Sequence, residues 1–313
     1  MARPGVAVVG GGPWGLALAG AAARTGEPTL LLSRRAHDGA LPRGVTLARD
    51  EREVGERARL ILMAVPSGVA RDVARALGAH LDGRHFVVHG VRGLVGEEME
   101  TISDVVHDES PVRRLGALGG PALASDLLAN RPTVMVAGSR YPEVLRALQQ
   151  VFASPTLRLY TTADLPGLEW ASALVGCLAI AVGYARGVGL GPGLLAALIT
   201  RAIEEAARLT AAAGGSDRTL LGLAGYGDLL ASIEQTERPE VLLGAALASG
   251  KTLEQALSET RQRVEAVDLT ARVAGWADGM RIPAPIFGAL ARGILPGRAS
   301  DVLVHELMTG PMT

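Results

Sequence analysis

The sequence predicts two domains of different class: an α/β domain with a doubly wound parallel sheet over residues 1–165, and an all-helical domain over residues 166–313. Three observations predict this division. Short apolar runs alternate with helix-length segments in the first half, the first run ends in a glycine-rich loop, and only helix-length segments follow Pro166. Continuous apolar strands that alternate with helices are typical of a parallel sheet covered on both faces.

The first domain begins with a β-branched run, Val6–Val9, which is followed by glycines and by a helical stretch of small residues, Trp14–Arg24. Similar apolar runs recur along the first half of the chain, and a second helix is expected over Val69–Leu77. Further strands are expected at Thr29–Leu32, Arg59–Val65, His85–His89, Arg114–Leu118, Thr133–Ala137 and Leu157–Tyr160.

The second domain is predicted to contain helices alone. Gly-Gly-Ser-Asp at 214–217 and Ile-Pro-Ala-Pro at 282–285 mark helix ends, and no segment has the pattern of a strand. The helices are expected at 167–186, 193–213, 219–223, 227–235, 239–249, 253–260, 265–278, 284–291 and 299–307.

The glycine-rich loop has the spacing of a dinucleotide site. Gly10, Gly12 and Gly15 form G-x-G-x-x-G between the first strand and the first helix, with Pro13 and Trp14 inside the motif. In such a Rossmann-type loop the first glycine permits a tight turn, the second lets a pyrophosphate approach the backbone, and the third lets helix and strand pack closely. The N–H groups at the helix start then face the phosphates.

The end of the second strand favours NADP over NAD. A ribose-binding carboxylate is expected about 20 residues after the glycine loop. Here that position reads Ser33-Arg34-Arg35, and no carboxylate follows until Asp38. Arginines at this place can bind a 2′-phosphate, and the alternative is an ordinary solvated basic loop.

Composition narrows the partners and the compartment. The chain is 48% hydrophobic and 20% charged with a net charge of −1, which indicates a large core and argues against a nucleic-acid or membrane surface. One cysteine excludes an internal disulfide, and the absence of a Cys/His cluster with zinc spacing predicts no metal site. No signal peptide is recognisable, so a cytoplasmic protein is expected. Residues 170–183 are apolar, but a membrane span needs ~20 such residues.

Several motifs in sequence order resemble the bacterial NAD(P)-dependent glycerol-3-phosphate dehydrogenases. The resemblance implies a Rossmann domain, a helical domain like that of 6-phosphogluconate dehydrogenase, a phosphorylated triose or related small substrate, and a homodimer. It also implies that Pro66 and Ala124 bind cofactor. The motifs are VVGGGPWGLALA (8–19), AVPS (64–67), HGVRGL (89–94), GGPALASDL (119–127), LITRAIEEAARL (198–209), GLAGYGDLL (222–230), VEAV (264–267) and IPAPI (282–286).

The resemblance assigns catalytic roles that this chain fills only in part. The family aspartate of G-x-G-D-L matches Asp228, for which helix capping is an alternative role. A family lysine that helps define the site falls on Arg92, which keeps the charge but does not release a proton near neutral pH. The acid/base lysine and its asparagine fall on Val175 and Gly176. Lys251, the only lysine, lies in a turn remote from that helix in the family architecture.

Two further residues complete the expected site. The family's phosphate-binding Arg-Asn pair falls near Arg238, which is one position out of register and is followed by proline. His89, three positions before Arg92, has a side chain suited to proton transfer, with a packed core histidine as the alternative. Cys177 is expected to pack in the core.

These observations leave three functions open. The first is a glycerol-3-phosphate-dehydrogenase-like oxidoreductase whose catalytic and phosphate-binding motifs are degraded. The second is a catalytically inactive protein that binds NAD(P)(H) and acts in regulation or scaffolding. The third is another two-domain dehydrogenase, such as one for hydroxy acids, although that group also commonly uses a lysine on the equivalent helix.

Overall fold

The computed structural model describes residues 5–35, 41–235, 237–260 and 264–296, which form two compact units. Unit 1 comprises the described residues up to Val95 together with Glu100–Glu169. Unit 2 comprises Gly96–Met99 together with the described residues from Trp170 onward. The helix expected at 299–307 lies outside the described residues.

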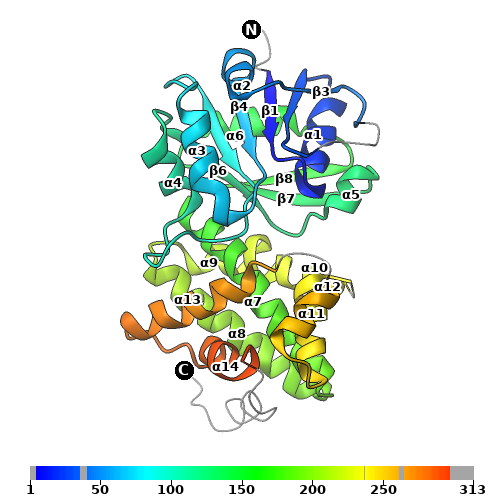
Figure 1. Cartoon of the computed structure of the whole chain (residues 1–313), viewed down its shortest axis with the longest axis vertical. Coiled ribbons are helices and arrows are strands. Elements are labelled where there is room, and N and C mark those ends of the chain that lie inside the picture. The colour runs from blue at the N-terminus through cyan, green and yellow to red at the C-terminus, as the bar shows by residue number, and fades with distance from the viewer. Residues whose placement is uncertain (1–4, 36–40, 236, 261–263, 297–313) are drawn as a thin grey trace. The chain divides into compact units, whose positions relative to one another are not determined.

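Unit 1 is built on an eight-stranded sheet with the strand order β3-β2-β1-β4-β5-β6-β7-β8 (Figure 1). The first strand lies inside the sheet, and the chain winds outward from it in both directions, which is the doubly wound arrangement that the sequence predicts. The strands are β1 (Val6–Val9), β2 (Thr29–Leu32), β3 (Val45–Leu47), β4 (Leu60–Met63), β5 (Phe86–His89), β6 (Arg114–Gly119), β7 (Thr133–Gly138) and β8 (Leu157–Thr162).

Helices connect these strands. Two of them are short: η1 is a 3-10 helix of three residues, and α5 is an α-helix of five residues. The helix expected over Val69–Leu77 is present as η1 and α3. The helical elements of unit 1 are α1 (Pro13–Arg24), α2 (Glu51–Arg57), η1 (Ser67–Val69), α3 (Ala70–Gly78), α4 (Ile102–Glu109), α5 (Ala124–Leu128) and α6 (Pro142–Val151).

One pair of strands corrects the prediction of a wholly parallel sheet. Strands β6 and β7 are antiparallel, with Leu118 opposite Ala137, whereas all other neighbours in the sheet are parallel. Between them lies only α5, which has five residues. Such a helix is about 7 Å long and does not return the chain along the whole length of a strand, so β7 runs back beside β6.

Strand β3 and helix α2 are not predicted by the sequence pattern. Strand β3 has three residues, of which the last two are exposed, so it shows no apolar run. Helix α2 reads EREVGER and lacks an apolar stripe. Its signal was the cap: the Asp50 side chain accepts a hydrogen bond of 2.8 Å from the N–H of Glu53.

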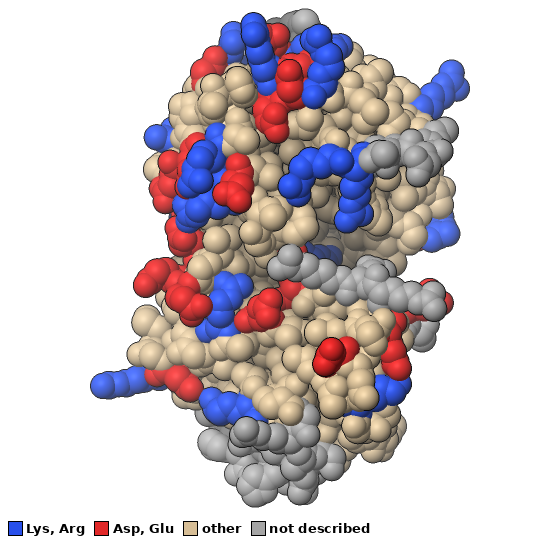
Figure 2. All heavy atoms as spheres, in the orientation of Figure 1, with Lys and Arg blue, Asp and Glu red and all other residues tan. Residues whose placement is uncertain are grey.

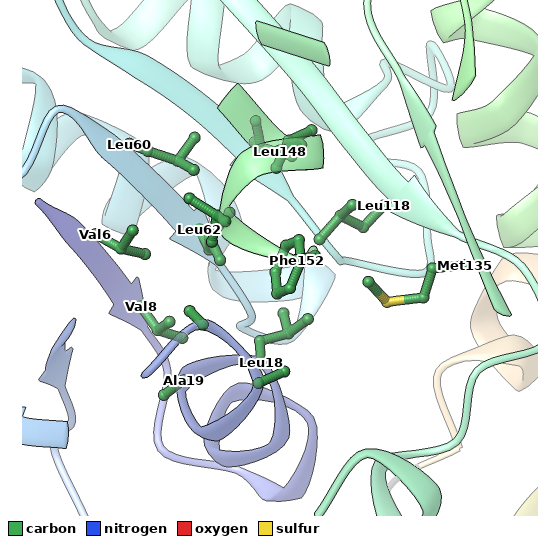
Figure 3. Packing of buried hydrophobic residues seen from close by; sticks show 14 of the residues in the cluster. Val6, Val8, Leu18, Ala19, Leu60, Leu62, Leu118, Met135, Leu148 and Phe152 are labelled. Atoms are coloured by element: carbon green, nitrogen blue, oxygen red, sulfur yellow. The ribbon is translucent and has the colours of Figure 1, made fainter. Parts of the chain in front are cut away.

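A cluster of buried hydrophobic residues in unit 1 lies between the sheet and the helices on one of its faces. Alternate residues of each strand point to the same face. Figure 3 shows Val6 and Val8 of β1 beside Leu60 and Leu62 of β4, with Leu18 of α1 packed against them, and all are buried. On the opposite face the intervening strand residues are buried as well, so the sheet is covered on both sides.

Charged side chains of unit 1 pair across neighbouring helices. The guanidinium of Arg71 on α3 lies 2.9 Å from Glu109 on α4 and 2.7 Å from Glu100. Arg75, one turn further along α3, also reaches Glu109, at 2.9 Å. Many basic and acidic side chains lie side by side on the face that Figure 2 shows. The α3–α4 contact is therefore ionic at its rim.

Unit 2 contains helices and no strand among its described residues. The predicted breaks fall between helices, and two of the helical turns are π-helical. The elements are α7 (Leu165–Gly187), α8 (Pro192–Ala212), α9 (Asp217–Leu221), η2 (Leu223–Gly227), α10 (Asp228–Ile233), α11 (Pro239–Ala248), α12 (Leu253–Thr260), α13 (Ala266–Gly279), α14 (Pro285–Ala289) and η3 (Leu290–Ile294). Helix α7 begins in unit 1 and continues into unit 2.

Glycines allow α7 and α11 to pack backbone against backbone. A Cβ atom at Gly183 would lie 2.3 Å from the carbonyl oxygen of Val241, and one at Gly244 would lie 2.2 Å from that of Ile180. Both positions therefore require glycine. Close packing of this kind explains why α7 is rich in glycine and alanine.

Helix α7 has 23 residues and is the one helix among those described that is long and apolar enough to cross a membrane. However, 94% of its most apolar 18-residue window is buried inside the protein. Helix α7 is longer than the apolar run at 170–183, but it is buried in the way that a core helix is.

Candidate active site

The glycine loop has the geometry that a dinucleotide site needs. Gly10 has a φ of 122°, and a Cβ atom there would lie 2.1 Å from the carbonyl oxygen of Ala64, just past β4. A Cβ atom at Gly15 would lie 1.8 Å from the carbonyl oxygen of Gly10. At Gly12, in contrast, no atom lies within 4 Å of the Cβ position. Packing thus requires two of the glycines, and the third leaves the backbone open to a ligand.

The first turn of α1 offers N–H groups without a competing side chain. Its N-cap residue is Gly12, no side chain caps the helix, and no acidic residue lies in the first turn. The first N–H groups of a helix have no partner within the helix and favour an anion. Pro13 occupies the first helical position, where it costs no hydrogen bond.

Trp14 has a packing role in this loop. A Cβ atom at Gly90, which follows β5, would lie 2.4 Å from the indole Nε1 of Trp14. The Trp14 side chain is half-buried and packs against the core of unit 1. Gly90 therefore makes room for the indole, and the contact joins the start of α1 to the end of β5.

The two arginines after β2 are exposed. The backbone N–H of Arg35 donates a hydrogen bond of 3.0 Å to the hydroxyl of Ser33, and this closes a turn in which Arg34 and Arg35 face solvent. Neither guanidinium forms an ion pair with another described residue. Asp38 lies outside the described residues. The turn can thus present two positive charges at the carboxyl end of β2.

The other two predicted cofactor residues also lie after strands of unit 1. Pro66 is exposed at the start of η1, just past β4. Ala124 begins α5, is half-buried, and packs against the same core as Trp14. These residues, the glycine loop and the arginine turn are the ones that would hold a dinucleotide, and the open Gly12 together with the uncapped α1 fits such a ligand.

His89 lies in a buried hydrogen-bond network. Its Nε2 is 2.8 Å from Oε1 of Glu169, and its Nδ1 accepts a hydrogen bond of 3.3 Å from the N–H of Val91. The same Glu169 oxygen accepts a hydrogen bond of 2.8 Å from the N–H of Ser103, in the first turn of α4. His89 and Glu169 are each 3% exposed. Both ring nitrogens are engaged, which favours a positioning role for His89 over the acid–base role expected from sequence.

Arg92 lies three residues after His89 in the sequence. Its guanidinium is half-buried and donates a hydrogen bond of 3.3 Å to the carbonyl oxygen of Gly120. This bond links the loop after β5 to the loop after β6. The hydrogen bond from Val91 to His89 fixes the backbone just before Arg92.

Asp228 lies in unit 2 as the first residue of α10 and is 1% exposed. It does not cap the helix: the N-cap residue is Gly227, and no side chain caps α10. Instead, the hydroxyl of Ser232, one turn later, lies 2.6 Å from the Asp228 carbonyl oxygen and 3.3 Å from its carboxylate. The capping alternative for Asp228 is therefore wrong.

Arg238 joins the same group of residues. One guanidinium nitrogen donates to the hydroxyl of Ser232, and Nε donates a hydrogen bond of 2.9 Å to a carboxylate oxygen of Glu240. The sequence motifs indicated Asp228 and Arg238 but not Ser232. The four-residue spacing from Asp228 to Ser232 was a usable signal, because such residues are neighbours on a helix.

The positions that replace the family lysine and asparagine are also in unit 2. Val175 is buried on α7. A Cβ atom at Gly176 would lie 3.1 Å from the Cβ atom of Ala266 and 3.6 Å from Oε1 of Glu240. Burial raises the pKa of the Cys177 thiol to about 12, and the nearby Glu240 carboxylate adds to this effect. Cys177 is a core residue, as predicted.

A doubly wound sheet with this glycine loop, followed by an all-helical unit, defines a two-domain dehydrogenase of the dinucleotide-dependent class. The family model of the NAD-dependent glycerol-3-phosphate dehydrogenase N-terminus matches residues 33–145, and that of the C-terminus matches residues 164–301. The chain therefore belongs to the NAD-dependent glycerol-3-phosphate dehydrogenase family.

Individual relatives agree with this assignment. The chain is 33% identical to a glycerol-3-phosphate dehydrogenase (NAD(P)+) of Teredinibacter turnerae, over 98% of this chain and 95% of that protein. It is 35% identical to the enzyme of the same name from Desulfitobacterium hafniense, over 85% of this chain and 80% of that protein. The crystal structure of glycerol-3-phosphate dehydrogenase from Coxiella burnetii matches with a TM-score of 0.89 and 28% identity, over 98% of this chain and 99% of that one.

Proposed function

We propose that this protein is an NAD(P)-dependent oxidoreductase that interconverts an alcohol and a ketone, with sn-glycerol 3-phosphate and dihydroxyacetone phosphate or a related hydroxy/keto pair as substrates. The observation that carries this proposal is the glycine loop, in which Gly10 and Gly15 are fixed by packing while Gly12 is open. Family membership supplies the reaction class. The comparisons do not support the alternative of a non-catalytic nucleotide-binding protein.

The dinucleotide supplies hydride transfer at its nicotinamide when it is bound. In our proposal the N–H groups of Gly12, Trp14 and Gly15 bind its pyrophosphate. Arg34 and Arg35 bind a 2′-phosphate, which favours NADP over NAD. Oxidation of an alcohol also releases a proton, and we assign Asp228, a buried carboxylate of unit 2, to the substrate site as the group that would accept it.

Val175 limits the rate of this mechanism, because its side chain neither donates nor accepts a proton. Loss of a general acid or base typically lowers a rate by ~10²–10⁴-fold without abolishing it. We therefore expect slow turnover.

We also infer a soluble, cytoplasmic homodimer. Sedimentation of the purified chain tests the dimer.

Two measurements test the proposal. Quenching of tryptophan fluorescence during titration with NADPH and NADH measures cofactor binding. The decrease of NAD(P)H absorbance, followed at high protein concentration, measures oxidation of the cofactor by dihydroxyacetone phosphate or dihydroxyacetone. We expect tighter binding of NADPH and slow oxidation. Binding without any turnover would refute the oxidoreductase, and no binding of either cofactor would refute the whole proposal.

A gain-of-function variant separates a missing acid/base group from other defects. In Val175→Lys we expect faster NADPH oxidation than in the parent protein. Val175→Met is the control, because methionine is long and flexible but does not transfer a proton. Equal rates for the two variants would mean that the side chain at residue 175 does not limit turnover.

A further inference from the structure

Unit 2 holds a buried charge cluster that consists of Asp228, Ser232, Arg238 and Glu240, here called the Arg238 cluster. Asp228 and Ser232 are 1% and 0% exposed. The side chains of Arg238 and Glu240 are 9% and 20% exposed. Hydrogen bonds run from Arg238 to Ser232 and to Glu240, and from Ser232 to Asp228. The cluster is thus internally connected and largely shielded from water.

The charges of the Arg238 cluster disfavour the binding of an anion. Arg238 is the only basic residue between Asp228 and Glu240 in the sequence. Its guanidinium is already paired with the Glu240 carboxylate at 2.9 Å, and the second carboxylate, Asp228, lies on the other side of Ser232. A phosphate dianion would have to displace Glu240 from Arg238 and remain near both carboxylates. Shielding from water strengthens that repulsion.

Glu240 also occupies the space beside α7. Its second carboxylate oxygen lies 3.6 Å from the Cβ position of Gly176, the position next to Val175. Because Gly176 has no side chain, the carboxylate fits against the helix backbone there. One carboxylate thus both pairs with Arg238 and lies against α7 at Gly176.

We propose that the Arg238 cluster selects a substrate without a phosphate at this end, namely a short uncharged polyol or hydroxy ketone. The inference rests on the proposed function, because it specifies the substrate class of that same site. Glu240 is the residue that determines this specificity: its carboxylate repels an anion and accepts hydrogen bonds from hydroxyl groups. The Arg238 side chain, expected from sequence to bind substrate phosphate, acts here as the partner of Glu240.

Equilibrium binding tests this inference independently of turnover. The NADPH complex does not react with an alcohol, so calorimetric titration of that complex with glycerol and with glycerol 3-phosphate measures binding alone. For the unmodified protein we expect glycerol 3-phosphate to bind no more tightly than glycerol. In Glu240→Gln, which keeps an acceptor for Arg238 but removes the charge, we expect a gain of about tenfold in affinity for glycerol 3-phosphate relative to glycerol.

Glu237→Gln is the matched control, because Glu237 is an exposed carboxylate three residues before Glu240, in the connection before α11. We expect it to leave the ratio of the two affinities unchanged. Tighter binding of glycerol 3-phosphate than of glycerol to the unmodified protein would overturn the inference, even if Glu240→Gln failed to fold. A folded Glu240→Gln with an unchanged ratio would overturn it as well. The proposed function has its own test: it is refuted if neither dihydroxyacetone phosphate nor dihydroxyacetone oxidises NAD(P)H.

Discussion

The imidazole of His89 and the carboxylate of Glu169 meet at 2.8 Å in the interior of unit 1, although the two residues are 80 positions apart in the sequence. His89 ends β5, and Glu169 lies in the second turn of α7. Glu169 also accepts the N–H of Ser103 at the start of α4, where a negative charge is favourable. The pair therefore ties the start of α7 to the sheet and to α4.

Breaking this pair will destabilise the protein. Removal of one partner leaves the other buried without its hydrogen bond, which typically costs about 1–3 kcal/mol. We expect a loss of this size in the free energy of unfolding for His89→Ala, measured by urea denaturation. His107→Ala is the control, because His107 and its partner Asp108 are both more than half exposed, at 53% and 58%. Equal effects of the two variants would show that the His89 pair contributes no stability.

The glycine loop separates packing from ligand binding. In Gly15→Ala the new methyl group would overlap the carbonyl oxygen of Gly10, so we expect the free energy of unfolding to fall by about 1–3 kcal/mol. In Gly12→Ala the methyl group meets no atom within 4 Å, so stability should be preserved while NADPH binding weakens. Thermal unfolding and fluorescence titration measure the two effects. If Gly12→Ala bound NADPH normally, the pyrophosphate would not approach the backbone there.

The arginine turn after β2 determines cofactor preference in our proposal. Hydrogen bonds to charged groups contribute about 1.5–3 kcal/mol each, so Arg34→Gln with Arg35→Gln should weaken NADPH binding by about tenfold or more. NADH binding should change little, since NADH lacks the 2′-phosphate. Arg140→Gln, a change of another exposed arginine of unit 1, should affect neither cofactor. An equal loss for NADH and NADPH would mean that the turn acts only through general charge.

Glu205 gives unit 2 a pH-dependent stability. It is buried on α8 and accepts hydrogen bonds from the N–H groups of Ile286 and Phe287 at the start of α14, at 2.9 Å and 3.3 Å. Burial raises its pKa from 4.5 to about 7. Because the folded state holds the proton more tightly than the unfolded state, the stability that this raised pKa provides is present below pH 4.5 and is lost as the pH rises to about 7.

We expect the unmodified protein to lose about 3 kcal/mol of stability relative to Glu205→Gln between pH 4.5 and pH 7. Urea denaturation of both proteins across this range measures the difference. Glu204→Gln, the neighbouring position on α8, is the control for a change of charge. A constant difference between the unmodified protein and Glu205→Gln across the range would mean that Glu205 titrates normally.

Much of the fold could be predicted because local pattern decides it. Runs such as Val6–Val9 are apolar on both faces, which only a covered sheet accommodates, and they were placed to within a residue or two. The charged helix α2 and the short strand β3 were missed because neither buries an apolar stripe. The antiparallel β7 was missed because strand direction depends on the path of the connection and not on the residues of the strand itself.

The sequence by itself determined the two-unit architecture, the glycine loop and the family, because these depend on spacing along the chain. The tertiary structure alone decided which charges meet. His89 and Glu169 are 80 residues apart, and nothing in either segment indicates the other. Arg238 and Glu240 are only two positions apart, and the fold decided that their side chains pair. A charged side chain binds whichever opposite charge the folded chain brings within a few ångströms, and that distance is set by packing.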